Sequence, residues 1–279
     1  MADAPFDARR DAAVLRHLRT AAIAKLGSGG AGRSLGFTVS FEDGRRAYFK
    51  PAQGDRGAHH FAEIAAFHVD RVLGTCRVAP VTGYRMAQAR LEAVAGADPR
   101  FARLHRDARG RVPGALIAWI DDGLGEVPVT RAWLSCLRKE PWPGSWPFKG
   151  LPRHRGGFAG CESLGNMLYA ISDMIVFDYL IANVDRWSAN LANVRRRGES
   201  GPLLFFDHGE AFWPGTFIAR TEAQLRFNQR ITGSMRAALE TFDVEALAQR
   251  LAEDPLAPVL TPEHLESLSL RLVAAQAHR

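Results

Sequence analysis

The chain has 279 residues, of which 47% are hydrophobic and 24% are charged, and its formal net charge at pH 7 is +6. These proportions exclude a mainly disordered chain, and the length favours one large domain or two closely packed lobes. The positive excess is modest and its clusters, such as 195–197, are typical of solvated loops, so we expect no nucleic-acid partner.

Cysteine content and apolar patterning bear on the compartment. Cys76, Cys136 and Cys161 are odd in number and far apart, which predicts neither a disulfide framework nor a zinc site. Charges interrupt the apolar positions of residues 1–26, unlike a secretory signal, and we see no uncharged apolar run of about 18 residues that would predict a membrane span. We therefore expect a cytoplasmic protein in a reducing compartment, with no membrane contact.

The first part of the chain favours a small, strand-rich lobe with one prominent helix. Hydrophobic periodicity and turn residues define its expected elements. In chain order they are a helix over 11–26, a glycine-rich loop over 27–34, a hairpin over 35–50, a helix over 59–74, and extended segments over 77–87 and 114–120.

The second part favours helices. Residues 141–157 are rich in proline, glycine and tryptophan, which predicts an irregular segment. A long apolar helix is expected from about 161 to the region of Asp185, and a short buried strand lies just before Asp207. The remainder is predicted to be helical, with a last helix that begins at Thr261-Pro262-Glu263.

Three side chains in the second part suit phosphoryl transfer. This reaction needs held phosphates, a metal charge, and an acceptor hydroxyl aligned beside a carboxylate. In VDRWSANLAN, Asp185 and Asn190 are five residues apart, so one short loop can present both side chains. Asp207 lies in the apolar stretch FFDHG, where a buried carboxylate needs a cation or a donor. We expect Asp185 as catalytic carboxylate, and Asn190 and Asp207 as ligands of a divalent metal.

A lysine and a glycine loop in the first part complete the set. Lys50 ends the predicted hairpin, and Glu63 in the next helix can hold its ammonium group toward phosphates. The glycines of the loop allow backbone N–H groups to approach phosphates without interference from Cβ atoms. The loop also matches a degenerate Walker A motif, which we reject because Arg33 replaces lysine and the loop does not join a strand to a helix. The expected nucleotide-binding residues are Gly27, Gly29, Gly32, Lys50 and Glu63.

Each feature alone has an ordinary structural interpretation. An Asp-Arg pair such as Asp185-Arg186 is usually a surface ion pair, and Lys50 before Pro51 is usually a solvated strand end. The combination is far more specific than any single motif.

This combination resembles the secretory-pathway kinases that include the Golgi casein kinase, the glycosaminoglycan xylose kinase and four-jointed. The resemblance covers roughly 27–240, and five stretches carry it. They are YFKP at Lys50, AEIAAFHVDRVLGTCRVAPVTG from Ala62, MIVFDYLIANVDRWSANL around Asp185, FFDHGEAF around Asp207, and LRFNQRITGSMRAALE from Leu225.

The resemblance implies an α+β, bilobal, atypical protein-kinase-like fold, with an N-lobe over 1–122 and a C-lobe over 123–279. It also implies ATP with Mg²⁺ or Mn²⁺, Glu63 as partner of Lys50 or as metal ligand, and the roles given above for the other residues. Asn190 is most similar to the four-jointed branch. The few cysteines and the missing signal pattern indicate a prokaryotic-type relative.

Family members phosphorylate protein or sugar hydroxyls, and the sequence does not decide between these acceptors. We predict an ATP-dependent kinase that acts on protein Ser or Thr. A sugar or small-molecule kinase stays open, as does a pseudokinase that binds nucleotide without transferring phosphate. The intact set of five side chains at 50, 63, 185, 190 and 207 argues against the pseudokinase.

Overall fold

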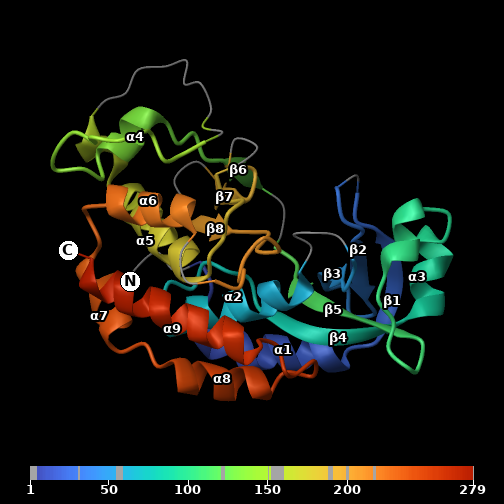
Figure 1. Cartoon of the computed structure of the whole chain (residues 1–279). Helices are drawn as coiled ribbons and strands as arrows, with labels where there is room; N and C mark the ends of the chain where they lie inside the picture. The colour runs from blue at the N-terminus through green and yellow to red at the C-terminus, as the bar shows by residue number, and fades with distance from the viewer. Residues whose placement is uncertain are drawn as a thin grey trace.

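The structure, a computed structural model, describes residues 5–30, 32–54, 59–120, 123–149, 151, 160–187, 191–198, 201–215 and 218–278. A five-stranded sheet lies at one end of the molecule and the helices α5–α9 lie toward the other end (Figure 1). The predicted α+β class is confirmed.

The elements in chain order are as follows. The helices are η1 (Ala8–Arg10), α1 (Asp11–Thr20), α2 (His60–Val72), α3 (Gln88–Ala95), η2 (Pro99–Arg103), α4 (Arg131–Ser135), η3 (Cys161–Leu164), α5 (Asn166–Leu180), α6 (Ala219–Phe227), α7 (Gly233–Glu240), α8 (Val244–Ala252) and α9 (Pro262–Ala277). The strands are β1 (Ile23–Ser28), β2 (Phe37–Phe41), β3 (Arg46–Pro51), β4 (Val81–Ala87), β5 (Arg111–Ala118), β6 (Leu124–Glu126), β7 (Val194–Arg197) and β8 (Leu203–Phe205).

The five-stranded sheet has the order β1-β2-β3-β5-β4, and every neighbouring pair is antiparallel. Along β2, the side chains of Phe37, Val39 and Phe41 are buried, which is the two-residue period of a strand with one face on a core. Gly44 turns the chain into β3 with a φ of 83°. The predicted hairpin is therefore confirmed, and Lys50 lies near the end of its second strand.

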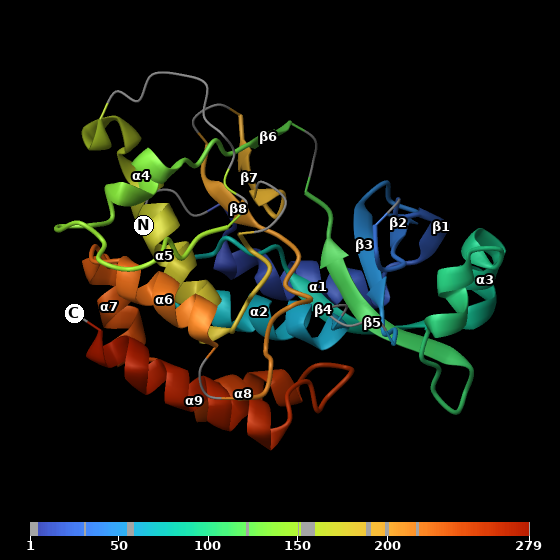
Figure 2. The ribbon, with the colours of Figure 1, turned by 45° about the horizontal axis from the view of Figure 1, so that its top comes forward.

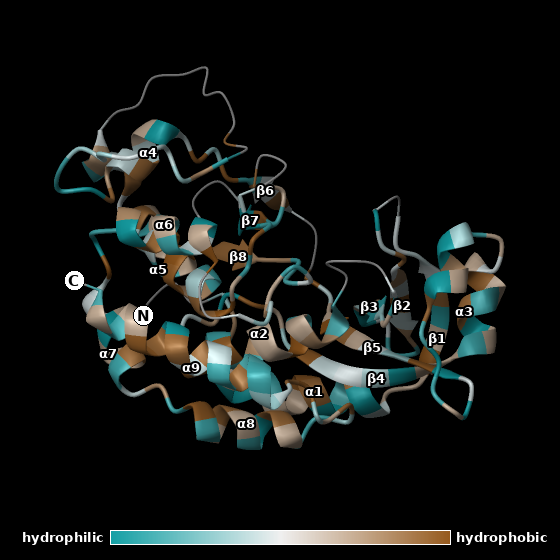
Figure 3. Ribbon diagram, viewed as in Figure 1, coloured by the Kyte–Doolittle hydropathy of each residue, from teal (hydrophilic) through white to brown (hydrophobic). Residues whose placement is uncertain are grey.

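Two hydrophobic cores hold the fold together. The smaller one joins Leu18 of α1 to the sheet, α3 and η2. The larger one joins α2, Val81 and Ala115 to the helices of the C-terminal half. Hydrophobic residues line β8 and α5 in the interior, and hydrophilic residues are frequent on the outer helices α3 and α8 (Figure 3). Because α2 shares its core with the C-terminal helices, the lobe boundary at 122 stays a prediction.

A smaller sheet lies on the helical side, in the order β6-β7-β8 (Figure 2). Its last strand leads directly into Phe206 and Asp207, which places this acidic residue at the edge of the C-terminal half. No helix in the described ranges combines the length and the apolar composition that crossing a bilayer requires.

The predicted helix over 11–26 is too long. It ends at Thr20 because Ala21 adopts an extended backbone, with φ −68° and ψ 141°. The next residues form β1, in which Leu26 pairs with Val39 of β2. Apolar residues at helical spacing were consistent with a continued helix, but pairing with the sheet overrides a weak local propensity.

The prediction that the cysteines form no disulfide is also wrong. Cys136 and Cys161 are bonded, with their Cα atoms 5.5 Å apart, and Cys76 is buried as a free thiol. The two bonded residues are separated by 25 positions, so only the fold brings them together.

Candidate active site

A cavity of about 780 Å³ opens between the five-stranded sheet and the C-terminal half. Its walls come from the β1–β2 connection, β3, α2, the stretch around β5 and β6, and two segments of the C-terminal half. The lining residues are Gly29, Gly32, Arg33, Ser34, Tyr48, Lys50, Glu63, Ile117, Ala118, Trp119, Ile120, Gly123, Leu124, Asp185, Phe206 and Asp207.

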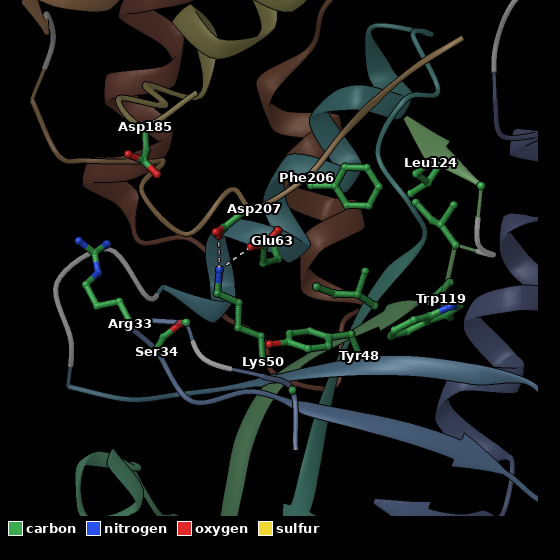
Figure 4. A pocket seen from close by; sticks show the side chains of 16 residues that line it. Arg33, Ser34, Tyr48, Lys50, Glu63, Trp119, Leu124, Asp185, Phe206 and Asp207 are labelled. Atoms are coloured by element: carbon green, nitrogen blue, oxygen red, sulfur yellow. Dashed lines mark hydrogen bonds and ion pairs between the residues drawn. The ribbon is translucent and has the colours of Figure 1, made fainter. Parts of the chain in front are cut away.

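The two ends of this cavity differ in character (Figure 4). Aromatic and aliphatic side chains, among them Tyr48, Trp119 and Phe206, gather at one end. Asp185 and Arg33 lie at the other end, and the carboxylates that face Lys50 lie between. A ligand with an apolar ring at one end and several negative charges at the other would match this distribution.

Lys50 is the centre of a buried ionic cluster. Its Nζ atom donates to Oε1 of Glu63 at 2.7 Å and to Oδ1 of Asp207 at 2.6 Å. Lys50 and Glu63 are only 7% and 2% exposed. Burial alone would lower the pKa of Lys50, but the two carboxylates outweigh burial and raise its pKa above the usual range. The lysine therefore stays charged and points into the cavity.

Glu63 is held from its other side by His208. The backbone N–H of His208 donates to Oε1 of Glu63 at 3.0 Å, and the ring atom Nδ1 lies 3.0 Å from Oε2. Burial alone would raise the pKa of Glu63, but Lys50 and these contacts keep its pKa well below the usual range. The glutamate is thus an ionised group with a fixed orientation.

Asp207 projects from a strained turn. Its φ is 50°, a left-handed conformation that non-glycine residues rarely adopt. Its side chain is 52% exposed although it pairs with the buried Lys50. This backbone geometry, which follows β8, presents the carboxylate to the cavity.

Two of the three predicted glycines reach the cavity. Gly29 and Gly32 line it, whereas Gly27 lies within β1 opposite Thr38 and does not. A Cβ atom on Gly29 would come within 2.6 Å of the backbone of Gly36 and within 2.8 Å of the Tyr48 ring. The missing side chains therefore let this connection lie directly against Tyr48.

Asp185 is positioned by the turn that follows α5. Its backbone N–H donates to the side-chain oxygen of Asn183 at 3.1 Å. The next residue, Arg186, is fully buried, donates to both oxygens of Asp178 in α5, and reaches the carbonyl of Phe206 at 2.6 Å. Arg186 therefore ties the Asp185 turn to the residue just before Asp207. Arg186 is therefore not on the surface, as the ordinary interpretation of an Asp-Arg pair would place it, and it forms a buried pair with Asp178.

The metal-ligand roles of Asn190 and Asp207 stay predictions, and Asn190 lies outside the described residues. Within the described ranges, no three His, Cys, Asp or Glu side chains are grouped to hold a metal ion. The accessible carboxylate of Asp207, with Glu63 beside it on Lys50, offers the hard oxygen ligands that suit Mg²⁺ or Mn²⁺. The residues present therefore fit such an ion.

Sequence reasoning missed three features of the site. His208 and Tyr48 had no pattern to distinguish them from packing residues, although both lie in motifs quoted for the resemblance. Arg33 was set aside together with the Walker A motif, yet it lines the cavity and pairs with Glu210 of the C-terminal half.

The fold and the site together define a class. A strand-rich half carries a lysine that pairs with a helix glutamate, and a helical half adds two acidic residues around the same cavity. This is the arrangement of a protein-kinase-like phosphotransferase.

The chain belongs to the family described as "Golgi casein kinase, C-terminal, Fam20", whose model matches residues 5–105 and 162–277. It is a kinase that transfers phosphate to a hydroxyl acceptor.

Two human relatives and one solved structure illustrate the similarity. The chain is 25% identical over 310 residues to glycosaminoglycan xylosylkinase, covering 95% of this chain and 73% of that protein. It is 24% identical over 305 residues to the extracellular serine/threonine protein kinase FAM20C, covering 93% of this chain and 52% of that protein. The crystal structure of the Golgi casein kinase with Mn/ADP bound matches with a TM-score of 0.69 and 19% identity, over 98% of this chain and 76% of that chain. This last match confirms the predicted bilobal fold.

These relatives overturn the predicted cytoplasmic location. The family description names the Golgi, and FAM20C is an extracellular kinase. The disulfide between Cys136 and Cys161 is also of the kind that persists in oxidising compartments. The prediction was wrong because it relied on the number and spacing of cysteines, which do not reveal their proximity in the fold.

Proposed function

We propose that the chain uses ATP with Mg²⁺ or Mn²⁺ to phosphorylate serine or threonine hydroxyls of protein substrates. One observation carries this proposal. Lys50 lies 2.7 Å from Glu63 and 2.6 Å from Asp207 inside a cavity that Asp185 also lines. A fixed ammonium group, accessible carboxylates and a separate acidic residue are the groups that phosphoryl transfer requires.

The charged residues take distinct roles in this proposal. Lys50 contacts the phosphates of ATP, and Glu63 keeps its ammonium group in place. Asp185 orients the acceptor hydroxyl and accepts its proton as the hydroxyl oxygen bonds to the terminal phosphorus of ATP, while the bond from that phosphorus to the bridging oxygen breaks and ADP leaves. Arg186 and Asn183 act through Asp185 as positioning residues, because they fix its turn.

The metal would bind through Asp207 and Asn190. When bound, Mg²⁺ or Mn²⁺ offsets the negative charge of the phosphates. The residues around it keep the phosphate chain between Lys50 and the backbone of Gly29 and Gly32.

The apolar end of the cavity would hold the adenine ring. Tyr48, Ile117 and Phe206 line this end and provide flat or aliphatic surfaces for an aromatic base. Trp119 is held in place there because the guanidinium of Arg46 lies 4.6 Å from its ring centroid. With the base at this end, the terminal phosphate points toward Asp185.

A sugar acceptor is the second candidate. The 25% identity to glycosaminoglycan xylosylkinase extends over 95% of this chain, which favours a glycan hydroxyl. Both candidates use the same donor site and differ only in what approaches Asp185. The pseudokinase alternative predicts nucleotide binding with no transfer to either acceptor.

A labelling experiment separates these candidates. The purified protein is incubated with radiolabelled ATP and Mn²⁺ or Mg²⁺, together with a panel of acidic peptides and a panel of xylose-containing glycans. We expect label in the peptides, and label only in the glycans would establish the sugar candidate instead. ATP binding with no label in either panel would contradict both kinase proposals.

Matched variants show whether the proposed site is responsible. Asp185→Ala should abolish transfer, whereas Asp43→Asn, in the exposed turn between β2 and β3, should leave it unchanged. Full activity of Asp185→Ala would refute the role proposed for this residue.

A further inference from the structure

An ion pair joins a residue that lines the cavity to the C-terminal half. Arg33 lies in the β1–β2 connection, and its Nη2 atom is 2.5 Å from Oε1 of Glu210, 177 residues later in the chain. The Arg33 side chain is 68% exposed, whereas that of Glu210 is 17% exposed. Glu210 lies three residues after Asp207, so the pair links the glycine-containing connection to the segment that follows the acidic turn.

Arg33 lies at the polar end of the cavity. In Figure 4 its guanidinium and Asp185 are on the same side, and the aromatic side chains are on the opposite side of Lys50. A triphosphate whose base occupies the aromatic end and whose middle lies at Lys50 would therefore end close to Arg33. The proposed donor orientation thus brings the terminal phosphate to this side chain.

The charges of the lining residues also favour a phosphate beside Arg33. Among the described side chains that line the cavity, the cationic ones are Lys50 and Arg33. Lys50 is buried and already contacts two carboxylates, while Arg33 has its pair at an exposed position. An exposed ion pair favours its paired form over its separated form by only about two- to fivefold. A guanidinium group also matches the geometry of phosphate oxygens, so phosphate competes well for Arg33.

The backbone on either side of Arg33 is anchored, and before it the carbonyl of Gly32 accepts from Arg100. The carbonyl of Ser34 accepts from Arg100 at 3.3 Å, and the backbone N–H of Leu35 donates to the side chain of Gln53 at 2.8 Å. An exchange of partners therefore requires rotation of the Arg33 side chain about its own bonds, and leaves the connection where it is.

We propose that Arg33 exchanges Glu210 for the terminal phosphate of the bound nucleoside triphosphate. Glu210 is then an internal competitor of phosphate, and Arg33 is a second phosphate-binding cation beside Lys50. This proposal rests on the proposed function, because it takes ATP as the donor.

Calorimetric titration tests the exchange. AMP-PNP, a triphosphate that is not turned over, and AMP are titrated in the presence of Mn²⁺ into the wild type, Arg33→Gln and Glu210→Gln. We expect Arg33→Gln to weaken AMP-PNP about tenfold, since it removes a charge-assisted contact. Glu210→Gln should tighten AMP-PNP about two- to fivefold, since it removes the competitor. Affinity for AMP, which lacks a terminal phosphate at that position, should stay the same in both variants.

Two further variants separate a phosphate contact from a merely structural effect. The gain from Glu210→Gln should vanish in the double variant with Arg33→Gln, because no cation is then released. Arg45→Gln removes an exposed arginine that pairs with Asp43 at a distant turn, and should leave both affinities unchanged.

The outcomes distinguish this inference from the proposed function. If the wild type binds AMP-PNP and Arg33→Gln binds it equally well, the inference is wrong while the donor site stands. If Glu210→Gln does not tighten AMP-PNP, Glu210 is not a competitor. If the wild type binds no AMP-PNP at all, the proposed function fails and the inference fails with it.

Discussion

The pair of Lys50 and Glu63 should stabilise the fold even without nucleotide. Replacing Lys50 by methionine leaves the buried carboxylate of Glu63 with the two contacts from His208 as its remaining partners. Removing one member of a buried ion pair costs about 3–5 kcal/mol, and the His208 contacts reduce this to about 2–3 kcal/mol. Asp207 adds little to the cost because it is half exposed.

The reverse change is milder. In Glu63→Gln, Lys50 keeps Asp207 at 2.6 Å, so we expect a loss of about 1–2 kcal/mol in the free energy of unfolding. The double variant Lys50→Met/Glu63→Gln has no buried unpaired charge. Its loss should also be about 1–2 kcal/mol, which is less than the sum of the two single losses. The cycle therefore predicts a coupling free energy of about 2–3 kcal/mol.

Urea unfolding at pH 7, followed by tryptophan fluorescence without nucleotide or metal, measures all four proteins. Arg33 and Glu210 provide a comparison cycle, because this pair is equally close but exposed, and its coupling should be below about 1 kcal/mol. Equal coupling in the two cycles, or a value below about 0.5 kcal/mol for Lys50 and Glu63, would refute the reasoning from burial.

Three other predictions follow from the site and the core. Asp207→Ala should weaken binding of ADP with Mn²⁺ roughly tenfold, as measured by calorimetry. This loss should exceed that of Asp185→Ala, because Asp207 is a proposed metal ligand and Asp185 is not. The reverse order would contradict the roles proposed for both residues. Gly36→Ala should push the Tyr48 ring aside, lowering the free energy of unfolding by about 1–3 kcal/mol and weakening nucleotide binding in the same titration. Burial raises the pKa of Asp173 from 3.8 to about 6. The stability that this carboxyl group contributes is therefore fully present below pH 3.8 and is lost as the pH rises through about 6. As the pH rises from 4 to 7, the free energy of unfolding of Asp173→Asn should therefore increase by about 1–3 kcal/mol relative to that of wild type, as measured by urea unfolding. A difference between the two proteins that does not change with pH would contradict this pKa shift.

Local patterns predicted the parts of the fold that depend on neighbouring residues. The hairpin that ends at Lys50, the helix of Glu63 and the long helix before Asp185 follow from hydrophobic period and turn residues. The family resemblance then indicated that these segments converge, and the contacts of Lys50 with Glu63 and Asp207 agree with it.

The missed features depend on contacts distant in sequence or on burial. A surface pair with its neighbour was the ordinary alternative for Arg186, but the end of α5 buries it against Asp178 eight residues earlier. Gly27 belonged to a glycine cluster, yet pairing with β2 draws it into the sheet. Cys136 and Cys161 are 25 positions apart, and their contact cannot be read from the spacing. None of these contacts has a signature in the sequence window around it.

Helix α2 carries Glu63 and is buried along most of its length against β4, β5 and α8. A drug that inhibits by displacing this helix outward would have to expose buried side chains such as Ile64, Phe67 and Val69 to water. Each exposure costs roughly 2 kcal/mol, so the whole displacement approaches the stability of an ordinary domain. Inhibitor design for this enzyme should therefore aim at compounds that compete for the donor cavity rather than at compounds that displace α2.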